Sequence, residues 1–127
     1  MRVRVYRNLH TRRNRRDLGR WSVMSWEGQT KGRVIDHRDV VVLQDCKLIV
    51  QPAGNARVRR EGVKNVHAFI EGQIDPLGDL EGYTYRGQIV YDPYKHQSFR
   101  LLSEDREISK YDGIILSRQV IAFERTA

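Results

Sequence analysis

The stretch Arg2-Val3-Arg4-Val5-Tyr6-Arg7-Asn8-Leu9 decides the fold class, because charged and apolar residues alternate along it with a period of two. This period is typical of a β-strand that buries one face. The same patterning, with β-branched and aromatic residues, continues along the rest of the chain. The further strands that it predicts are Trp21–Trp26, Arg33–Leu43 with a break at His37–Asp39, Cys46–Gln51, Asn65–Glu71, Tyr83–Tyr91, Gln97–Leu102, Gly113–Leu116 and Gln119–Glu124.

Turn-forming residues separate these strands. The turns that they predict are Glu27-Gly28, Lys31-Gly32, Asp75-Pro76-Leu77-Gly78, Glu81-Gly82, Asp92-Pro93 and Asp112-Gly113. Only Ala53–Glu61 favours a helix, with Asn55 as its N-cap and Gly62 as its end. The sequence therefore predicts a mostly β fold, either all-β or α+β dominated by strands, with antiparallel meanders and at most one short helix.

The length of 127 residues predicts one compact domain, residues 1–127. Three short motifs recur in the same order in two halves, residues 1–72 and 83–127. Val5–His10 matches Val90–Lys95, Val41–Leu43 matches Ile114–Leu116, and Val66–Phe69 matches Val120–Phe123. The motifs favour either an internal duplication, in which two related meanders pack together, or chance similarity among β-rich segments.

Three features bear on the compartment. The longest apolar runs, Val40–Leu43 and Ile114–Leu116, are far shorter than the roughly 20 residues that span a bilayer. The N-terminus carries no apolar stretch of the secretory type. Cys46 is the single cysteine, so no internal disulfide can form. We therefore expect a cytoplasmic protein that makes no membrane contact.

The net charge of +7 is confined to the first twenty residues. Met1–Arg20 contains eight arginines and one acid, Asp17, whereas the basic and acidic residues of the rest of the chain balance. Clustered arginines displace counterions from phosphates, so this pattern predicts contact with a polyanion. The densest part is Thr11–Arg20, called the basic segment below. We expect it at the tip of a hairpin that joins the strands Arg2–Leu9 and Trp21–Trp26.

Within the basic segment, arginines would contact phosphates and an asparagine would reach base edges. The candidate nucleic-acid-binding residues are Arg12, Arg13, Asn14, Arg15, Arg16 and Arg20. Nearby Tyr6, Trp21 and Trp26 would offer stacking faces to unpaired bases. The alternatives are an acidic protein partner or mere solvation for the segment, a core position for both tryptophans, and a solvated edge-strand face for Arg2 and Arg4.

The four histidines, His10, His37, His67 and His96, raise the question of an enzyme. A metal-independent ribonuclease would use two histidines as general base and acid, and His10 and His67 are the candidates. The alternative for His67, on a predicted strand, is an interior position. The spacings of a zinc site, a phosphate-binding glycine loop and a nucleophile elbow are all absent from the sequence. We therefore predict no catalytic residue, no metal and no cofactor.

Four segments carry a resemblance to a known group of proteins: Tyr6–His10, Trp21–Val23, Gly32–Val34 and Lys64–Phe69. Together, over about residues 4–72, they resemble small uncharacterised proteins of bacteriophages and related mobile elements. The resemblance implies an accessory gene that acts in a bacterial host, and it implies no activity. In those relatives the stretch between His10 and Trp21 is short, so the basic segment is a feature of this chain.

These observations predict a small basic phage-type accessory protein, non-enzymatic, that binds nucleic acid through an arginine-rich hairpin. Its partner would be RNA or DNA, or an acidic host or virion protein, and a homo-oligomer is also open. The first alternative is a virion structural or assembly protein that uses the hairpin for subunit or DNA contacts. The second alternative is the ribonuclease.

Overall fold

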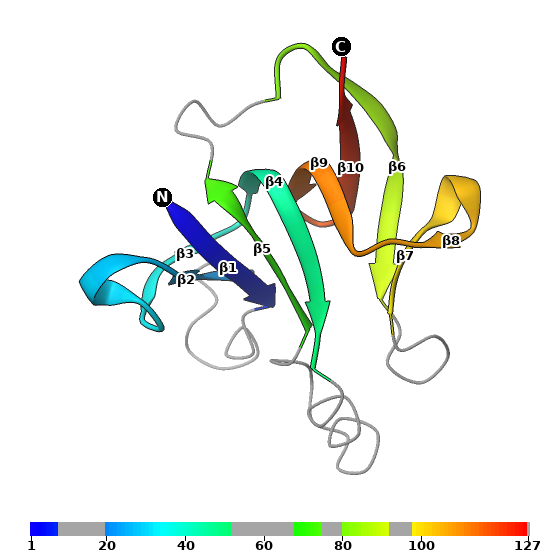
Figure 1. Cartoon of the computed structure of the whole chain (residues 1–127). Helices are drawn as coiled ribbons and strands as arrows, with labels where there is room; N and C mark the ends of the chain where they lie inside the picture. The colour runs from blue at the N-terminus through cyan, green and yellow to red at the C-terminus, as the bar shows by residue number, and fades with distance from the viewer. Residues whose placement is uncertain (8–19, 52–67, 75–79, 92–97, 127) are drawn as a thin grey trace.

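The computed structural model describes residues 1–7, 20–51, 68–74, 80–91 and 98–126 (Figure 1). Within these residues ten strands form one sheet. The strands are β1 Arg2–Arg7, β2 Trp21–Ser25, β3 Val34–Arg38, β4 Val41–Val50, β5 Ala68–Ile74, β6 Tyr83–Tyr91, β7 Phe99–Leu101, β8 Arg106–Glu107, β9 Lys110–Leu116 and β10 Val120–Arg125. Two short 3₁₀ turns, η2 Gly28–Thr30 and η3 Leu102–Glu104, complete the described elements.

The strand order is β3-β2-β1-β5-β4-β9-β10-β6-β7-β8, and every neighbouring pair is antiparallel. This confirms the prediction of a mostly β single domain. The predicted strand Tyr83–Tyr91 coincides with β6. The predicted helix Ala53–Glu61 lies outside the described residues. No helix in the described part of the chain is long and apolar enough to cross a membrane.

The sequence prediction divided β4 into two strands, whereas the structure has one. Asp45 adopts a left-handed conformation with φ of 52°, and the pairing with β5 shifts register between Gln44 and Lys47. Such a bulge accommodates an extra residue without ending the strand. The polar stretch around Asp45 is therefore a bulge within a strand that continues to Val50.

The prediction of a turn at Asp112-Gly113 is wrong, because both residues lie inside β9. Gly113 is buried, and a Cβ atom on it would lie 2.9 Å from Leu80 Cδ1. The glycine therefore leaves space for the Leu80 side chain, and it does not form a turn. The sequence prediction also missed β8, whose two charged residues form too short a segment to show a period.

The order of the strands has a two-fold pattern centred on the β4–β9 pair. Outward from β4 the order is β5, β1, β2, β3, and outward from β9 it is β10, β6, β7, β8. Each strand of the first five thus has a counterpart in the second five, and the three repeated motifs fall on the counterpart pairs β1 and β6, β4 and β9, and β5 and β10.

The residue matches, however, do not share one register. In the sheet Leu43 pairs with Ile74, and Leu116 pairs with Val120. If Leu43 is aligned with Leu116, Ile74 must therefore be aligned with Val120. The motif match instead places Ala68 on Ala122. The strand order agrees with an internal duplication and the residue registers do not, so the duplication stays a prediction.

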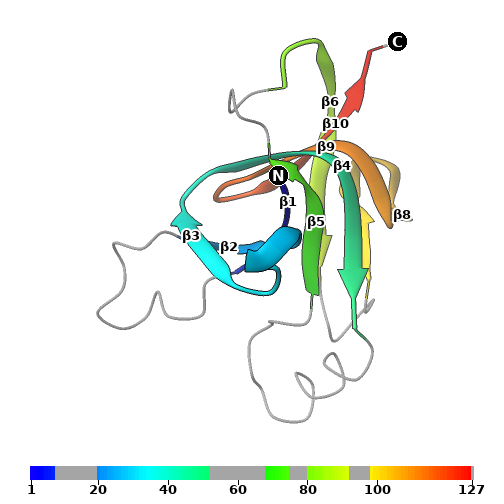
Figure 2. The same ribbon diagram turned by 60° about the vertical axis from the view of Figure 1, so that its left-hand side comes forward.

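The sheet is strongly curled, as Figure 2 shows, and its apolar core lies inside the curl. Residues from both ends of the strand order belong to one buried cluster, including Val5 and Val23 of β1 and β2 and Leu101 of β7. Leu43 and Ile114 of the central strands are fully buried in the same cluster. Since these strands are far apart in the sheet order, only a curl brings their side chains together.

A pair of glycine substitutions tests the tight packing of the central strands. A Cβ atom on Gly72 would lie 2.8 Å from the backbone oxygen of Gln44, whereas the closest atoms to a Cβ on Gly113 are methyl groups of Leu80. A backbone atom cannot move aside as a side chain can. We expect Gly72→Ala to lower the free energy of unfolding by about 1–3 kcal/mol, and Gly113→Ala by less. Urea denaturation measures both, and an equal or larger loss for Gly113→Ala would refute this explanation.

Candidate nucleic-acid interface

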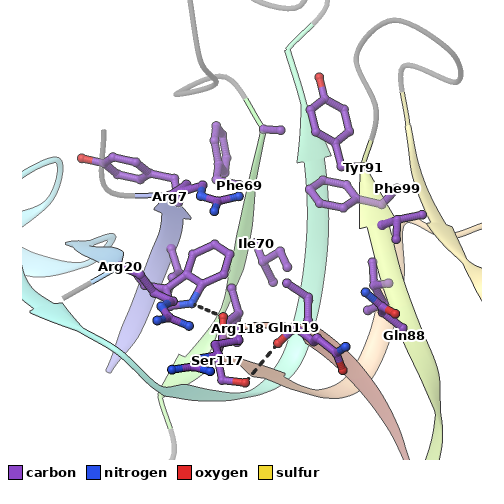
Figure 3. Close-up of a pocket in the computed structure, with 18 of the residues that line it drawn as sticks. Arg7, Arg20, Phe69, Ile70, Gln88, Tyr91, Phe99, Ser117, Arg118 and Gln119 are labelled. Atoms are coloured by element: carbon purple, nitrogen blue, oxygen red, sulfur yellow. Dashed lines mark hydrogen bonds between the residues drawn. The ribbon is translucent and has the colours of Figure 1, made fainter. Parts of the chain in front are cut away.

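A cavity of about 780 Å³ lies where the curl brings the two halves of the sheet face to face (Figure 3). One wall comes from the end of β1, the start of β2 and the start of β5. The other wall comes from β6 and the start of β7. The turn between β9 and β10, residues 117–119, completes the lining. This cavity is called the cleft below.

A cross-sheet hydrogen bond ties the two sides of the cleft together. The indole Nε1 of Trp21 donates to the backbone oxygen of Ser117 at 2.9 Å (Figure 3). Ser117 in turn holds its own turn closed, because its backbone N–H donates to the oxygen of Gln119 at 2.9 Å. The position of β2 relative to the β9–β10 turn is thus fixed by a specific contact.

Aromatic side chains come from both walls. Trp21 lies on one side, and Tyr91 and Phe99 lie on the other. Tyr6 and Phe69 also border the cleft, but they alternate with the core residues Val5 and Ile70 and so lie on the face of the sheet that carries Arg4. The Tyr91 and Phe99 rings pack with centroids 5.2 Å apart and planes tilted by 34°. Burial raises the pKa of the Tyr6 phenol, so this side chain stays neutral. The cleft therefore offers flat apolar faces with polar edges.

Three arginines, Arg7, Arg20 and Arg118, line the same cleft. Arg20 has a carboxylate nearby, with its Nε 3.9 Å from Oδ1 of Asp39, but the Asp39 side chain is 75% exposed and such a pair is weak. Arg7 and Arg118 are exposed and make no ion pair with any carboxylate in the described ranges. Asp39 lines the cleft as well, so the described charged residues of the lining are three arginines and one carboxylate, which makes the lining cationic.

The basic segment connects directly to this cleft. β1 and β2 pair antiparallel with Arg7 opposite Trp21, so the two strands that the segment was expected to join are neighbours. Arg20, the last of the predicted contact residues, is part of the cleft lining. The other predicted contact residues, Arg12, Arg13, Asn14, Arg15 and Arg16, lie outside the described residues. The chain therefore leaves the cleft at Arg7 and returns to it at Arg20.

Arg2 and Arg4 serve a different purpose. Both bind the buried Glu71, through Arg2 Nη2 at 2.6 Å and Arg4 Nε at 3.0 Å from its carboxylate oxygens. The alternative that Arg2 and Arg4 form the solvated face of an edge strand is wrong, because β1 lies between β2 and β5 and both arginine side chains are only a fifth to a quarter exposed. These two charges are neutralised within the fold and are not part of the cationic cleft.

Trp26 packs against Arg4, and it is part of neither the cleft nor the apolar core. The guanidinium carbon of Arg4 lies 3.4 Å from the centroid of the Trp26 ring and 4.4 Å from that of Phe69. The ammonium of Lys31 lies 4.8 Å from the Trp26 ring as well. These cation–π contacts occupy the ring. Trp21, by contrast, packs at the margin of the apolar core and borders the cleft.

Catalytic groups are sparse in the described part of the chain. His37 is the one histidine there, and its Nδ1 lies 3.2 Å from Ser22 Oγ on β2, away from the cleft. His10, His67 and His96 lie outside the described residues. Burial raises the pKa of the Cys46 thiol to about 12, which makes it a poor nucleophile. The described residues contain no group of three or more metal-ligating side chains.

Several cleft residues were not foreseen from the sequence. Arg7 and Arg118 are 111 positions apart in the numbering, and Tyr91 and Phe99 lie on strands that face them only because the sheet curls. The one local signal is Ser117-Arg118-Gln119, a polar triplet between two apolar strands, which marks an exposed turn.

Comparison with known proteins gives two matches and one negative result. The family model described as "Mycobacterium phage L5 gene 82 protein" matches residues 1–124. The "Gene 82 protein" of Mycobacterium phage L5 is 43% identical over 99 residues, which cover 78% of this chain and 76% of that protein. No solved structure matches the chain.

Proposed function

The chain belongs to the family of the Mycobacterium phage L5 gene 82 protein, and we propose that it is a non-enzymatic phage accessory protein that binds nucleic acid through its basic segment and the cleft. One observation carries the proposal: the chain leaves the cleft at Arg7, just before residues 8–19, and returns to it at Arg20. The cleft also holds Arg7 and Arg118, which are exposed and pair with no carboxylate of the described residues. The remaining charges of the N-terminal cluster, on Arg2 and Arg4, are satisfied internally. Of the eight arginines in residues 1–20, Arg7 and Arg20 therefore line the cleft, and four more lie in the stretch of chain between them.

The chemistry of this region suits a phosphate chain. Residues 8–19, which connect Arg7 to Arg20 along the chain, contain four arginines and only one acid, Asp17. Arginine binds phosphate through a planar fork of donors and stays charged at all working pH values. Clustered guanidinium groups release the counterions condensed on nucleic acid, which favours binding regardless of base sequence. The primary contact is therefore expected to be with the phosphate backbone.

A virion or assembly role is the second candidate, and the open edge of the sheet favours it. β3 forms one edge, and Val34 and Ile35 on this strand are each 44% exposed. An open edge with apolar side chains is a place where another subunit can add a strand. Light scattering separates the two candidates, because a structural component forms defined assemblies without nucleic acid.

Shortening the basic segment tests the proposal. A variant in which a two-residue turn replaces Thr11–Gly19 is expected to keep its thermal midpoint within a few degrees, because β1 and β2 still pair at Arg7 and Trp21. Its affinity for a fluorescent 20-nucleotide RNA at low salt should fall at least tenfold. Circular dichroism and fluorescence anisotropy measure the two quantities.

The control is Arg33→Gln, which removes one exposed cation that does not line the cleft. This variant should bind nearly as well as the parent. Undiminished RNA binding by the shortened variant would place the contact elsewhere on the molecule. Loss of folding would show that the segment packs against the sheet.

A further inference from the structure

We propose that the cleft is a binding site for one unpaired nucleotide, which stacks its base between the aromatic walls and places its phosphate on Arg118 of the exposed turn. For a polymeric ligand the inference rests on the proposed function, and it makes the preferred partner single-stranded. For a free mononucleotide it stands alone, since the site consists of described residues of the sheet itself.

The size and rigidity of the cleft suit a small planar ligand. Its volume of about 780 Å³ falls within the range of roughly 300–1,000 Å³ usual for small-molecule sites. The two walls are parts of one hydrogen-bonded sheet, and the bond from Trp21 to Ser117 joins the first wall to the β9–β10 turn. A preformed site loses little entropy when its ligand binds.

The aromatic walls supply the surface that a base recognises. Trp21 is half-buried and lines the first wall of the cleft, and Tyr91 lines the other wall (Figure 3). The hydrogen bond from Nε1 fixes the orientation of the Trp21 ring. Every base has two π-faces, so stacking on these rings tolerates any sequence. A base within a duplex has both faces covered by neighbours, which gives the site its preference for unpaired nucleotides.

Polar groups are arranged to complement the rest of a nucleotide. Gln88 and Gln119 line the second wall and the turn, and each amide carries both a donor and an acceptor, as base edges do. Arg7 and Arg118 lie on opposite sides of the cleft and make no ion pair with a described carboxylate. An acidic peptide would also pair with the arginines, but a polyglutamate chain has no planar ring to stack on Trp21 and Tyr91.

Fluorescence of Trp21 provides the test. The full-length Trp26→Phe variant leaves Trp21 as the single tryptophan, and Trp26 lies outside the cleft. We expect adenosine monophosphate to quench this fluorescence saturably, and adenosine to bind about tenfold more weakly because it lacks the phosphate. Quenching should persist when Arg12, Arg13, Arg15 and Arg16 are replaced with serine, since the site does not need them.

Two further variants complete the design. Trp21→Ala should lower affinity for oligo(U) about tenfold, which corresponds to ~1.4 kcal/mol of stacking, and leave affinity for duplex DNA unchanged. Arg118→Gln lies on an exposed turn, where we expect no folding defect. It should weaken the binding of adenosine monophosphate more than the binding of adenosine. Arg33→Gln should change neither affinity.

The outcomes separate this inference from the proposed function. Salt-sensitive polymer binding that depends on the basic segment, combined with no quenching by adenosine monophosphate, overturns the nucleotide site and leaves the proposed function standing. Quenching without polymer binding supports the nucleotide site and overturns the proposed function. Quenching by a polyglutamate peptide but not by the nucleotide overturns the site in favour of an acidic protein.

Discussion

Replacing Arg12, Arg13, Arg15 and Arg16 with serine is expected to remove most of the salt dependence of nucleic-acid binding. If the four arginines engage about four phosphates of duplex DNA, the parent protein has a log–log slope of affinity against salt near −3.6. Between 50 and 200 mM salt this slope corresponds to a loss of about 150-fold in affinity. The variant should show a much flatter slope, to which the cleft arginines alone contribute.

The measurement is a titration of random duplex DNA and single-stranded RNA at several ionic strengths. The four serine substitutions should lower affinity by a similar factor for nucleic acids of unrelated base sequence, because contacts with the phosphate backbone do not read sequence. A control replaces Arg33, Lys47 and Lys110 with serine, since these exposed cations lie outside the cleft and form no ion pair within the described ranges. A parental slope in the four-serine variant would show that the basic segment makes no phosphate contact.

Glu71→Ala is expected to destabilise the fold more than any surface substitution. Glu71 is 6% exposed and accepts hydrogen bonds from Nε and Nη2 of Arg2 and from Nε of Arg4. Its removal leaves two guanidinium charges in a partly buried site without a counterion. Breaking a buried pair in this way costs about 3–5 kcal/mol, and the partial exposure of the arginines favours the lower end. Urea denaturation at neutral pH measures the loss.

The same cluster predicts a pH dependence. Burial by itself would raise the pKa of Glu71, but the hydrogen bonds and charges of Arg2 and Arg4 outweigh burial and hold the pKa below its ordinary value of 4.5. The ion pairs therefore add stability above this value, and that stability is lost as pH falls through the lower folded-state pKa. The parent should lose stability more steeply than Glu71→Gln below about pH 4.5. If the free energy of unfolding falls in parallel with pH for the parent and for Glu71→Gln, this account is contradicted.

The fold class could be predicted from the sequence because the period of two is a local property. Tyr83–Tyr91 is an example, since the alternation alone locates this strand at its observed ends. The errors arise where a distant residue decides the structure. Gly113 looks like part of a turn until Leu80 is known to pack against it, and Asp45 looks like a strand end until its bulge is seen.

The candidate site could be predicted only in part. The density of arginines in the basic segment is visible in the sequence, and Arg20 does line the cleft. Two facts depend on contacts between remote residues and were therefore hidden. Glu71, 67 positions from Arg4, neutralises the start of the charge cluster, and the curl of the sheet brings Arg118 and Tyr91 to the cleft.

Photocrosslinking tests most directly the central claim that nucleic acid is bound at the basic segment and the cleft. A single-stranded RNA containing 4-thiouridine is irradiated with the full-length protein at low salt, and crosslinked residues are located by mass spectrometry. We predict crosslinks within the basic segment and at Trp21 or Tyr91. Crosslinks confined to Trp26 or Tyr85, which lie outside the cleft, or no crosslink at all, would contradict the account.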